Sequence, residues 1–459
     1  MATTTHEDRL ELPIIPVTPT AAENIQSLLG VEECVRYYPP NLESVNDPGA
    51  IFLAEPTLRM DRKIDLFVDV PYCGTICGFC PFNVYPYNET EVRSYLRAVE
   101  TEVGEIKARH DFSQITVRTV WIGGGTPSTM EEYALDTLLR MLHDNFDLTQ
   151  VKELTFEIKP TLSDLTDAKF DILHRYHVNR ISMGVQSTDQ DQLRILGRGH
   201  TSTEAFQVIE KVKDAGFALN IDMMYRLPGQ TQHEVENDLD AVRLLGIDHI
   251  SWFPYVSHPG TSLANRIDRG RVTQPAGRNE YFAMFKAVLE RMSDAGYEQY
   301  TPYHFSLTGR CEYHVDRWQM PQLETLGIGP GAFSFFNGRI YANEHSPVKY
   351  AQAGDDHLPP VMMAKKLSQT EMITRLAVLG SKFFVIDMEK FLEQSGVEMD
   401  MYYEKELELL VRAGLIEVQD NRVECTLAGR AFNNDVATIF GTDTARRTKH
   451  PQAVDLMRI

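Results

Sequence analysis

Short apolar runs alternate along residues 60–300 with longer stretches in which apolar side chains recur every three or four positions. The runs are typical of strands inside a sheet, and the stretches are typical of helices with one buried face. The expected strands are 64–70, 117–122, 153–158, 179–185, 218–224 and 249–255. The expected helices are 89–109, 129–145, 163–176, 202–215, 231–245 and 278–295. Six strand-then-helix units in series predict an α/β fold, a full or partial (βα)6 TIM-type barrel with right-handed crossovers.

The pattern changes after about residue 365, where two helices precede two short strands and a further helix. The two strands flank Asp420 and Asn421, so this region is expected to form a winged-helix-like α+β module over residues 360–459. Residues 61–350 form the barrel domain, and the Pro-rich residues 1–60 are expected to be a segment that wraps the surface. A lid or packing role is expected for the module, and DNA binding is the weaker alternative.

Composition narrows the classes of function. The chain has 45 Lys and Arg residues against 65 Asp and Glu residues, a formal net charge of −20, which repels nucleic-acid backbones and anionic lipid surfaces. We therefore expect no nucleic-acid partner and no membrane partner. The sequence contains no apolar run of membrane-spanning length and no signal-peptide pattern, so the cytoplasm is the expected location. Its six cysteines do not form the dense framework of a disulfide-stabilised secreted domain.

Three of these cysteines lie within eight positions on a loop that follows the first expected strand. They are Cys73, Cys77 and Cys80, with Gly74 and Gly78 between them. Structural zinc normally takes four ligands, and a disulfide would leave one thiol over. Three thiolates can instead hold three irons of a [4Fe-4S] cluster and leave the fourth iron open to another ligand. Coincidental core cysteines are the alternative, but the glycines favour a loop that wraps tightly around a bulky group.

The spacing Cys-x₃-Cys-x-Phe-Cys after the first strand is similar to the signature of the radical S-adenosylmethionine (SAM) enzymes. The surrounding motifs resemble the oxygen-independent coproporphyrinogen III oxidase subgroup over roughly residues 60–345. This resemblance implies that SAM chelates the open iron and that an electron from the cluster cleaves it to a 5′-deoxyadenosyl radical. It also implies a small-molecule substrate and an electron donor such as flavodoxin or ferredoxin.

Polar residues and glycines stand at the ends of successive expected strands, where barrel enzymes build their sites. Any one of them could be an ordinary core polar group, but their shared position favours a common site. By resemblance, the positions that contact one or two SAM molecules are Gly124, Gly125, Thr126, Glu157, Gln186, Arg198, Asp222, Val256 and Phe333. Phe79, between two of the cluster cysteines, is expected to flank the adenine.

The sequence departs from the resembled subgroup at positions that concern the substrate. Phe82 stands where the oxidases have a fourth cysteine, and Phe67 and Asp69 replace an early tyrosine and histidine. Related heme chaperones carry a His-Asn-x-x-Tyr-Trp segment. If Trp318 aligns with that tryptophan, Tyr313 and Arg317 replace the segment's histidine and tyrosine, while the neighbouring His314 could still bind heme iron.

Three functions remain open from the sequence. The preferred one resembles the class C radical SAM methyltransferases and cyclopropanases, in which a second SAM donates a carbon to an sp² centre. The alternatives are a dehydrogenase that acts on a porphyrinogen-like substrate and a heme-binding chaperone. Methyl transfer of this kind also needs a group that moves a proton. The candidates are Tyr303, His304, Tyr313 and His314.

Overall fold

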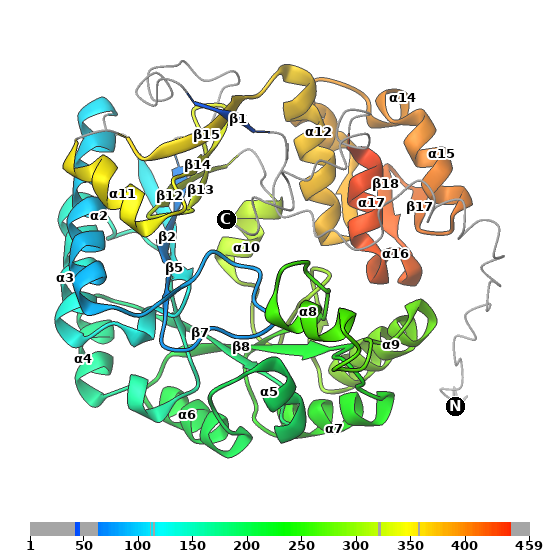
Figure 1. Cartoon of the computed structure of the whole chain (residues 1–459). Coiled ribbons are helices and arrows are strands. Elements are labelled where there is room, and N and C mark those ends of the chain that lie inside the picture. Colours follow the sequence, from blue (N-terminus) through cyan, green and yellow to red (C-terminus); the bar gives the residue numbers. More distant parts are fainter. Residues whose placement is uncertain are drawn as a thin grey trace, which may run out of the picture.

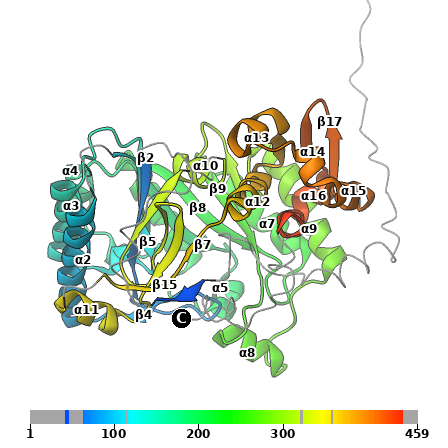
Figure 2. The same ribbon diagram turned by 90° about the horizontal axis from the view of Figure 1, so that it is seen from above.

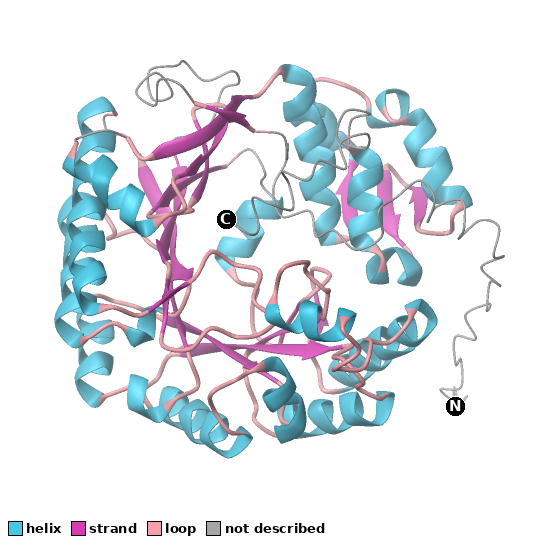
Figure 3. Ribbon diagram, in the orientation of Figure 1, coloured by secondary structure: helices cyan, strands magenta, loops and turns pink. Residues whose placement is uncertain are grey.

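The computed structural model describes residues 42–45, 63–110, 112, 115–319, 323–356 and 359–441. Most of the expected N-terminal wrapping segment therefore lies outside the described residues. The centre of the fold is a strongly curved sheet with helices on its convex face (Figures 1 and 3). Its parallel strands are β2 (Lys63–Val70), β5 (Thr116–Gly124), β6 (Glu153–Ile158), β7 (Arg180–Gln186), β8 (Ala218–Tyr225) and β9 (His249–Pro254), each paired with the next.

Helices follow these strands along the chain, and those between β2 and β9 connect neighbouring parallel strands. They are α2 (Glu89–Arg109), α3 (Glu132–Asn145), α4 (Asp167–Arg175), α5 (Gln190–Leu196), α6 (Ser202–Asp214), α7 (Gln232–Arg243), α8 (Ser262–Asp268) and α9 (Arg278–Asp294). The apolar faces of α2, α3, α4, α6, α7 and α9 form one continuous core with the strands, whereas Leu196 of α5 and Leu263 and Ile267 of α8 belong to a separate apolar cluster. The expected six strands and six helices are present, while the short α5 and α8 were not predicted because each spans only two turns.

Additional strands extend both edges of the sheet and keep it from closing. β12 (Glu324–Ile328) adds in parallel beside β2, and β13 (Phe333–Phe336), β14 (Arg339–Asn343), β15 (Val361–Lys366) and β1 (Glu43–Ser44) continue that edge in antiparallel pairing. β11 (His304–Ser306) and β10 (Glu298–Gln299) extend the other edge beside β9. The sheet runs from β1 to β10, which do not pair, so the barrel is partial.

Helix α10 (Glu312–Gln319) lies on the concave side of the sheet (Figure 1). Arg118 of β5 pairs with Asp316, with 2.8 Å between Nε and Oδ2. At the start of the helix, Glu153 of β6 accepts hydrogen bonds from the Cys311 thiol and the Glu312 backbone, both at 3.1 Å. These contacts fix α10 inside the curve of the sheet.

The C-terminal module lies across the molecule from α2, α3 and α4 (Figure 2). It contains a small sheet in the order β16–β18–β17 and its own apolar core. Its elements are α12 (Gln369–Gly380), β16 (Val385–Asp387), α13 (Met388–Ser395), α14 (Met399–Tyr402), α15 (Glu404–Arg412), β17 (Ile416–Gln419), β18 (Arg422–Cys425), α16 (Leu427–Ala431) and α17 (Asn433–Phe440). The expected strand pair is a hairpin whose turn residues, Asp420 and Asn421, have φ of 50° and 57°, as a tight hairpin turn requires. The strand that directly follows residue 360 is β15, which belongs to the large sheet.

A buried carboxylate on α2 holds the later strands against the barrel. Glu102 accepts hydrogen bonds from the Gly329 backbone at 2.9 Å, from Asn343 Nδ2 at 2.6 Å, and from the Tyr350 hydroxyl. Gly329 has φ of 103°, and a Cβ there would collide with the backbone oxygen of Asp69. Glu102 therefore supports the turn that backs the end of β2.

The free energy of unfolding should depend on pH because of the Glu102 carboxylate. Burial raises the pKa of Glu102 to about 7, so the folded chain holds a proton that the unfolded chain releases near 4.5. The resulting stabilisation is complete below pH 4.5 and is lost as the pH rises through 7. We expect the unfolding free energy of the native chain to fall relative to that of Glu102→Gln between pH 5.5 and 8, measured by urea denaturation. A constant difference between the two chains would contradict this.

Candidate functional site

The cysteine loop follows β2 and is held by two helices of the barrel. Cys73 is buried, and its Sγ lies 3.3 Å from Thr126 Oγ1. Gly78 donates from its backbone to Leu196 at the end of α5 at 2.9 Å, and its carbonyl accepts from Leu263 of α8 at 2.7 Å. The two unpredicted helices thus clamp the loop at the residue between the second and third cysteines.

The three thiols suit a multinuclear cluster better than a single ion. Burial raises the pKa of Cys73, and it raises the pKa of Cys80 to about 12; in both cases the Cys77 charge makes a smaller contribution to the rise. Arg198 Nη1 donates to Cys77 Sγ at 3.1 Å. Among the described residues, no three His, Cys, Asp or Glu side chains are spaced to hold one metal ion. Thiolates on separate irons need no such convergence, and iron would displace the thiol protons on binding.

Three carboxylates stand at the carboxyl ends of the strands. Glu157 of β6 accepts from Trp121 Nε1 at 2.6 Å, and burial raises its pKa to about 7, with a smaller contribution from Asp222. Asp222 of β8 accepts from Asn220 Nδ2 at 2.8 Å, and burial raises its pKa. Asp69 of β2 is buried with no hydrogen bond to its Oδ1, and burial followed by the Glu157 charge raises its pKa. Burial is thus the first cause of a raised pKa in all three acids.

Three glycines at the end of β5 leave space that other parts of the chain fill. A Cβ on Gly123 would collide with Glu157, one on Gly124 would collide with Asp69, and one on Gly125 would lie 2.7 Å from the Tyr72 carbonyl. The backbone amides of Gly125 and Thr126 bond to the loop after β2, each at 2.8 Å. Neighbouring strand ends therefore occupy the space that the missing side chains leave, and contact of Gly124 and Gly125 with SAM stays a prediction.

The side chains of Gln186 and Arg198 both lie next to Gly184 of β7. A Cβ on Gly184 would lie 2.6 Å from Gln186 Nε2 and 3.4 Å from Arg198 Nη2. Arg198 also donates to the Gly184 carbonyl. Gln186 ends the strand with φ of 77°, which turns its side chain toward Gly184. Two of the expected SAM-contact residues therefore lie side by side, next to the cysteine loop.

The remaining expected SAM contacts are apolar. Phe79 packs against an apolar group that includes Leu196 and Tyr255. Val256 is half-buried and directly follows Tyr255. Phe333 begins β13 and packs beside the apolar group around Phe335. Phe79 and Val256 thus lie near the cysteine loop and the end of β9, whereas Phe333 lies on the added edge of the sheet.

Histidines from three elements meet on the concave side of the sheet. The rings of His304 and His314 lie 4.0 Å apart, and His249 of β9 lies 5.7 Å from His304. His249 bonds through Nδ1 to Asn220 and through Nε2 to Tyr300, both at 2.6 Å. Burial, with a smaller contribution from Arg180, lowers the pKa of His304 to about 3, and the same two causes lower the pKa of His249. Both rings are neutral at physiological pH.

Tyrosines complete this group. Tyr313 and His314 lie against the Trp121 ring at 5.2 and 5.4 Å, so Trp121 connects α10 to Glu157. The Tyr303 hydroxyl accepts from Asn434 Nδ2 at 2.8 Å. The structure therefore brings together all four residues that were proposed to move protons.

Sequence reasoning missed several members of the site, namely Asp69, Trp121, Asn220, His249, Tyr300 and Asn434. The sequence did contain a signal for Asn220. It lies two residues before Asp222, and alternate residues of a strand share a face. The side chains of Arg317 and Trp318, which would test the heme-chaperone alignment, lie outside the described part of the chain.

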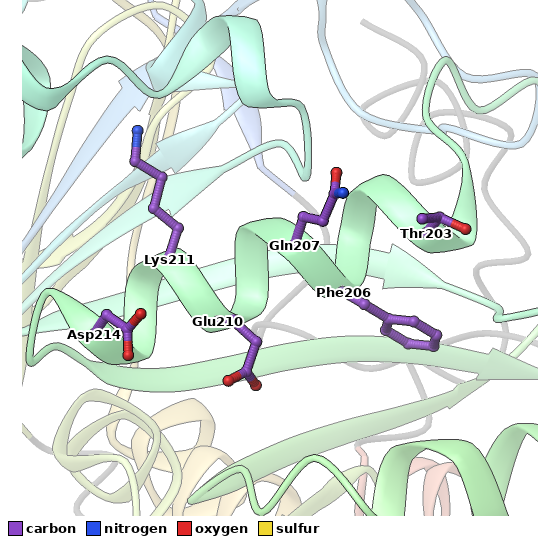
Figure 4. Close-up of a pocket in the computed structure, with 6 residues that line it drawn as sticks. All are labelled: Thr203, Phe206, Gln207, Glu210, Lys211 and Asp214. Carbon is purple, nitrogen blue, oxygen red and sulfur yellow. The ribbon is translucent and has the colours of Figure 1, made fainter.

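An open hollow on the outside of the helical layer offers no competing site. All of its lining residues come from one helix, α6, as Figure 4 shows: Thr203, Phe206, Gln207, Glu210, Lys211 and Asp214. Lys211 already bonds to the Leu165 carbonyl at 2.8 Å and pairs with Asp167 at 2.9 Å. None of the cysteines or strand-end acids takes part.

Comparisons with known proteins agree with this geometry. Residues 67–242 match the Radical SAM superfamily, and residues 367–432 match the HemN C-terminal domain. The heme chaperone HemW of Bacillus subtilis is 29% identical over 82% of this chain and 98% of its own length. The HemW of Mycobacterium tuberculosis is 31% identical over 63% of this chain and 74% of its own.

The fold matches a solved structure over nearly its whole length. The coproporphyrinogen III oxidase HemN of Escherichia coli superimposes with a TM-score of 0.74 at 22% identity, covering 86% of this chain and 92% of the other. This likeness confirms the expected fold class, a partial barrel with a C-terminal module. No helix within the described ranges is long and apolar enough to cross a bilayer. The chain belongs to the radical SAM superfamily, in the subgroup that carries the HemN C-terminal domain, and the family's cofactors are a [4Fe-4S] cluster and SAM.

Proposed function

We propose that this chain is a radical SAM enzyme that abstracts a hydrogen atom from a tetrapyrrole. The observation that carries the proposal is the cysteine loop, Cys73, Cys77 and Cys80, held beside strand-end acids in a chain that has both domains of its relatives. When bound, the cluster supplies the electron that cleaves SAM to a 5′-deoxyadenosyl radical.

The substrate class comes from the two kinds of relative. One is named a heme chaperone and the other a coproporphyrinogen III oxidase, and both names refer to tetrapyrroles. We therefore propose that this chain also recognises a tetrapyrrole. The oxidase-type reaction is preferred over pure carriage because the cysteine loop and the expected SAM contacts on neighbouring strands are all present, namely Glu157 on β6, Gln186 on β7, Asp222 on β8, and Arg198 after α5.

The chain's own groups suit proton handling near the reacting atoms. His304 is neutral, so its ring offers one N–H donor and one acceptor nitrogen, and its Nδ1 lies 2.6 Å from Thr301 Oγ1. Burial raises the pKa of Glu157 to about 7, with a smaller contribution from the Asp222 charge, and burial followed by the Glu157 charge raises the pKa of Asp69. We propose Tyr303, His304, Tyr313 and His314 as the groups that exchange protons with the substrate.

Heme binding without turnover is a second candidate. It is favoured by the heme-chaperone relatives and by the buried His304, whose neutral imidazole has the protonation state that an iron ligand needs. Stoichiometric heme uptake that is lost in His304→Ala and in His314→Ala would support this candidate.

The methyl-transfer function that the sequence favoured finds no support in the names of the relatives above. It would need a second SAM beside the first, which we keep as a proposal tied to Gln186, Arg198 and Asp222. The products decide between the functions: methyl or methylene transfer yields S-adenosylhomocysteine together with 5′-deoxyadenosine, while hydrogen abstraction alone yields only the latter.

The test is an anaerobic assay of the reconstituted protein with SAM, dithionite, and either coproporphyrinogen III or heme. We expect 5′-deoxyadenosine to rise at least tenfold when one of the tetrapyrroles is added, with a matching change in that tetrapyrrole by mass spectrometry. S-adenosylhomocysteine in equal amount would move the function to carbon transfer. Heme binding with no deoxyadenosine would favour the chaperone, and no response to either compound would overturn the substrate class.

A further inference from the structure

The C-terminal module contacts the candidate site through the ring of Phe383, 6.0 Å from that of Tyr300, and through the side-chain amide of Asn434. Asn434, in the first turn of α17, donates from Nδ2 to the Tyr303 hydroxyl at 2.8 Å. Its Oδ1 accepts from Lys382 Nζ at 2.6 Å. An ammonium group can only donate, so Lys382 fixes the amide with its oxygen toward the lysine and its nitrogen toward Tyr303. Lys382 is 2% exposed, so water does not compete for its hydrogen bond to Asn434.

The surroundings make the contact rigid. Tyr281 of α9 donates its hydroxyl to the Ala431 carbonyl at 2.5 Å, just before α17. Arg278 of α9 lies over the Phe432 ring at 4.3 Å. On the barrel side, the Tyr303 carbonyl accepts from the Trp252 backbone at 2.7 Å. The segment just before Asn434 is thus held against α9 of the barrel, and the backbone of Tyr303 is held within the barrel.

We propose that Asn434 is a positioning residue that orients the Tyr303 hydroxyl for the reaction, so that the C-terminal module completes the active site. This rests on the proposed function, in which Tyr303 exchanges a proton with the substrate. Because the phenol oxygen accepts from Asn434, its own hydrogen points away from the module. Nothing in the comparisons assigns a role to this residue, and the bond joins positions 131 residues apart.

A double-mutant cycle with matched controls tests the coupling. We expect Asn434→Ala to lower kcat with the proposed tetrapyrrole about tenfold with KM within twofold, because one hydrogen bond is lost. In the Tyr303→Phe background the same change should have no further effect. Asn433→Ala is the control: its Nδ2 donates to the Ser381 carbonyl at 2.8 Å inside the module, so it weakens the module without touching Tyr303. Equal losses in Asn433→Ala, or an undiminished effect of Asn434→Ala in the Tyr303→Phe background, would overturn the proposal.

A spectroscopic readout separates this inference from the proposed function. With 3-fluorotyrosine placed at position 303, the ¹⁹F shift reports the phenol pKa without substrate or cofactor. A donor to the phenolate lowers that pKa, so Asn434→Ala should raise it by about half a unit to one unit, while Asn433→Ala leaves it unchanged. An unchanged pKa in Asn434→Ala would overturn the positioning role. A raised pKa in a protein that turns over no tetrapyrrole would leave the contact standing and refute the proposed reaction.

Discussion

Replacement of Cys73, Cys77 and Cys80 by alanine is expected to remove the iron–sulfur cluster and all SAM cleavage. The structure places the three thiols on one clamped loop, and no His, Asp or Glu among the described residues joins them in a single-ion site. A chain without these thiolates has nothing to hold the irons. We expect iron and sulfide per chain to fall to background after reconstitution, together with the visible absorption, and 5′-deoxyadenosine to become undetectable.

The other described cysteines provide matched controls. Cys425 lies in the C-terminal module, and Cys311 lies at the start of α10 with its thiol on Glu153. Cys425→Ala and Cys311→Ser should both keep the cluster, because serine preserves the hydrogen bond to Glu153. If the triple variant retained full iron content, or if Cys311→Ser lost it, the ligand assignment would be wrong.

The second large effect is expected at Glu157, whose carboxylate lies between Trp121, Asp69 and Asp222 at the strand ends. SAM carries a sulfonium and an ammonium, so an ionised Glu157 should strengthen its binding. We expect Glu157→Gln to weaken SAM binding roughly tenfold to a hundredfold at pH 8, the range for a hydrogen bond to a charged group. The amide oxygen can still accept from Trp121, so the change removes charge more than structure. Anaerobic calorimetry of the reconstituted protein gives the affinity.

The same carboxylate should make SAM affinity depend on pH. The pKa of Glu157 is raised to about 7, so the group is neutral below that pH and ionised above it. SAM affinity of the native chain should therefore rise between pH 6 and 8, whereas that of Glu157→Gln should stay flat. Glu131→Gln, at an exposed position before α3, is the control and should behave as the native chain does. A native affinity that is independent of pH would refute the role of Glu157.

The sequence alone predicted those helices and strands that are specified by residues close to one another in the chain. Helix α2 spans the predicted residues because Asn88 caps its start with hydrogen bonds to Thr90 and Glu91, and its apolar positions keep one helical face over 21 residues. Strand β6 also has its predicted bounds, since Leu154, Phe156 and Ile158 alternate with polar residues and all three pack into the core. The cysteine spacing was equally local, and the family comparison agrees with the resemblance drawn from it.

The tertiary structure decided which side chains meet on the concave side of the sheet. It also decided that the C-terminal module contacts them. The cluster of His249, His304 and His314 depends on β11 pairing beside β9 and on α10 entering the concave side, and neither event has a signature in nearby residues. The Tyr303–Asn434 bond depends on docking of the whole module. Periodicity tells which face of a strand or helix is apolar, but buried polar groups find their partners through long-range packing, because only the assembled core brings their donors and acceptors together. The sequence thus determined the barrel and the chemistry of its cysteines, and the fold decided which acids, histidines and tyrosines share the site.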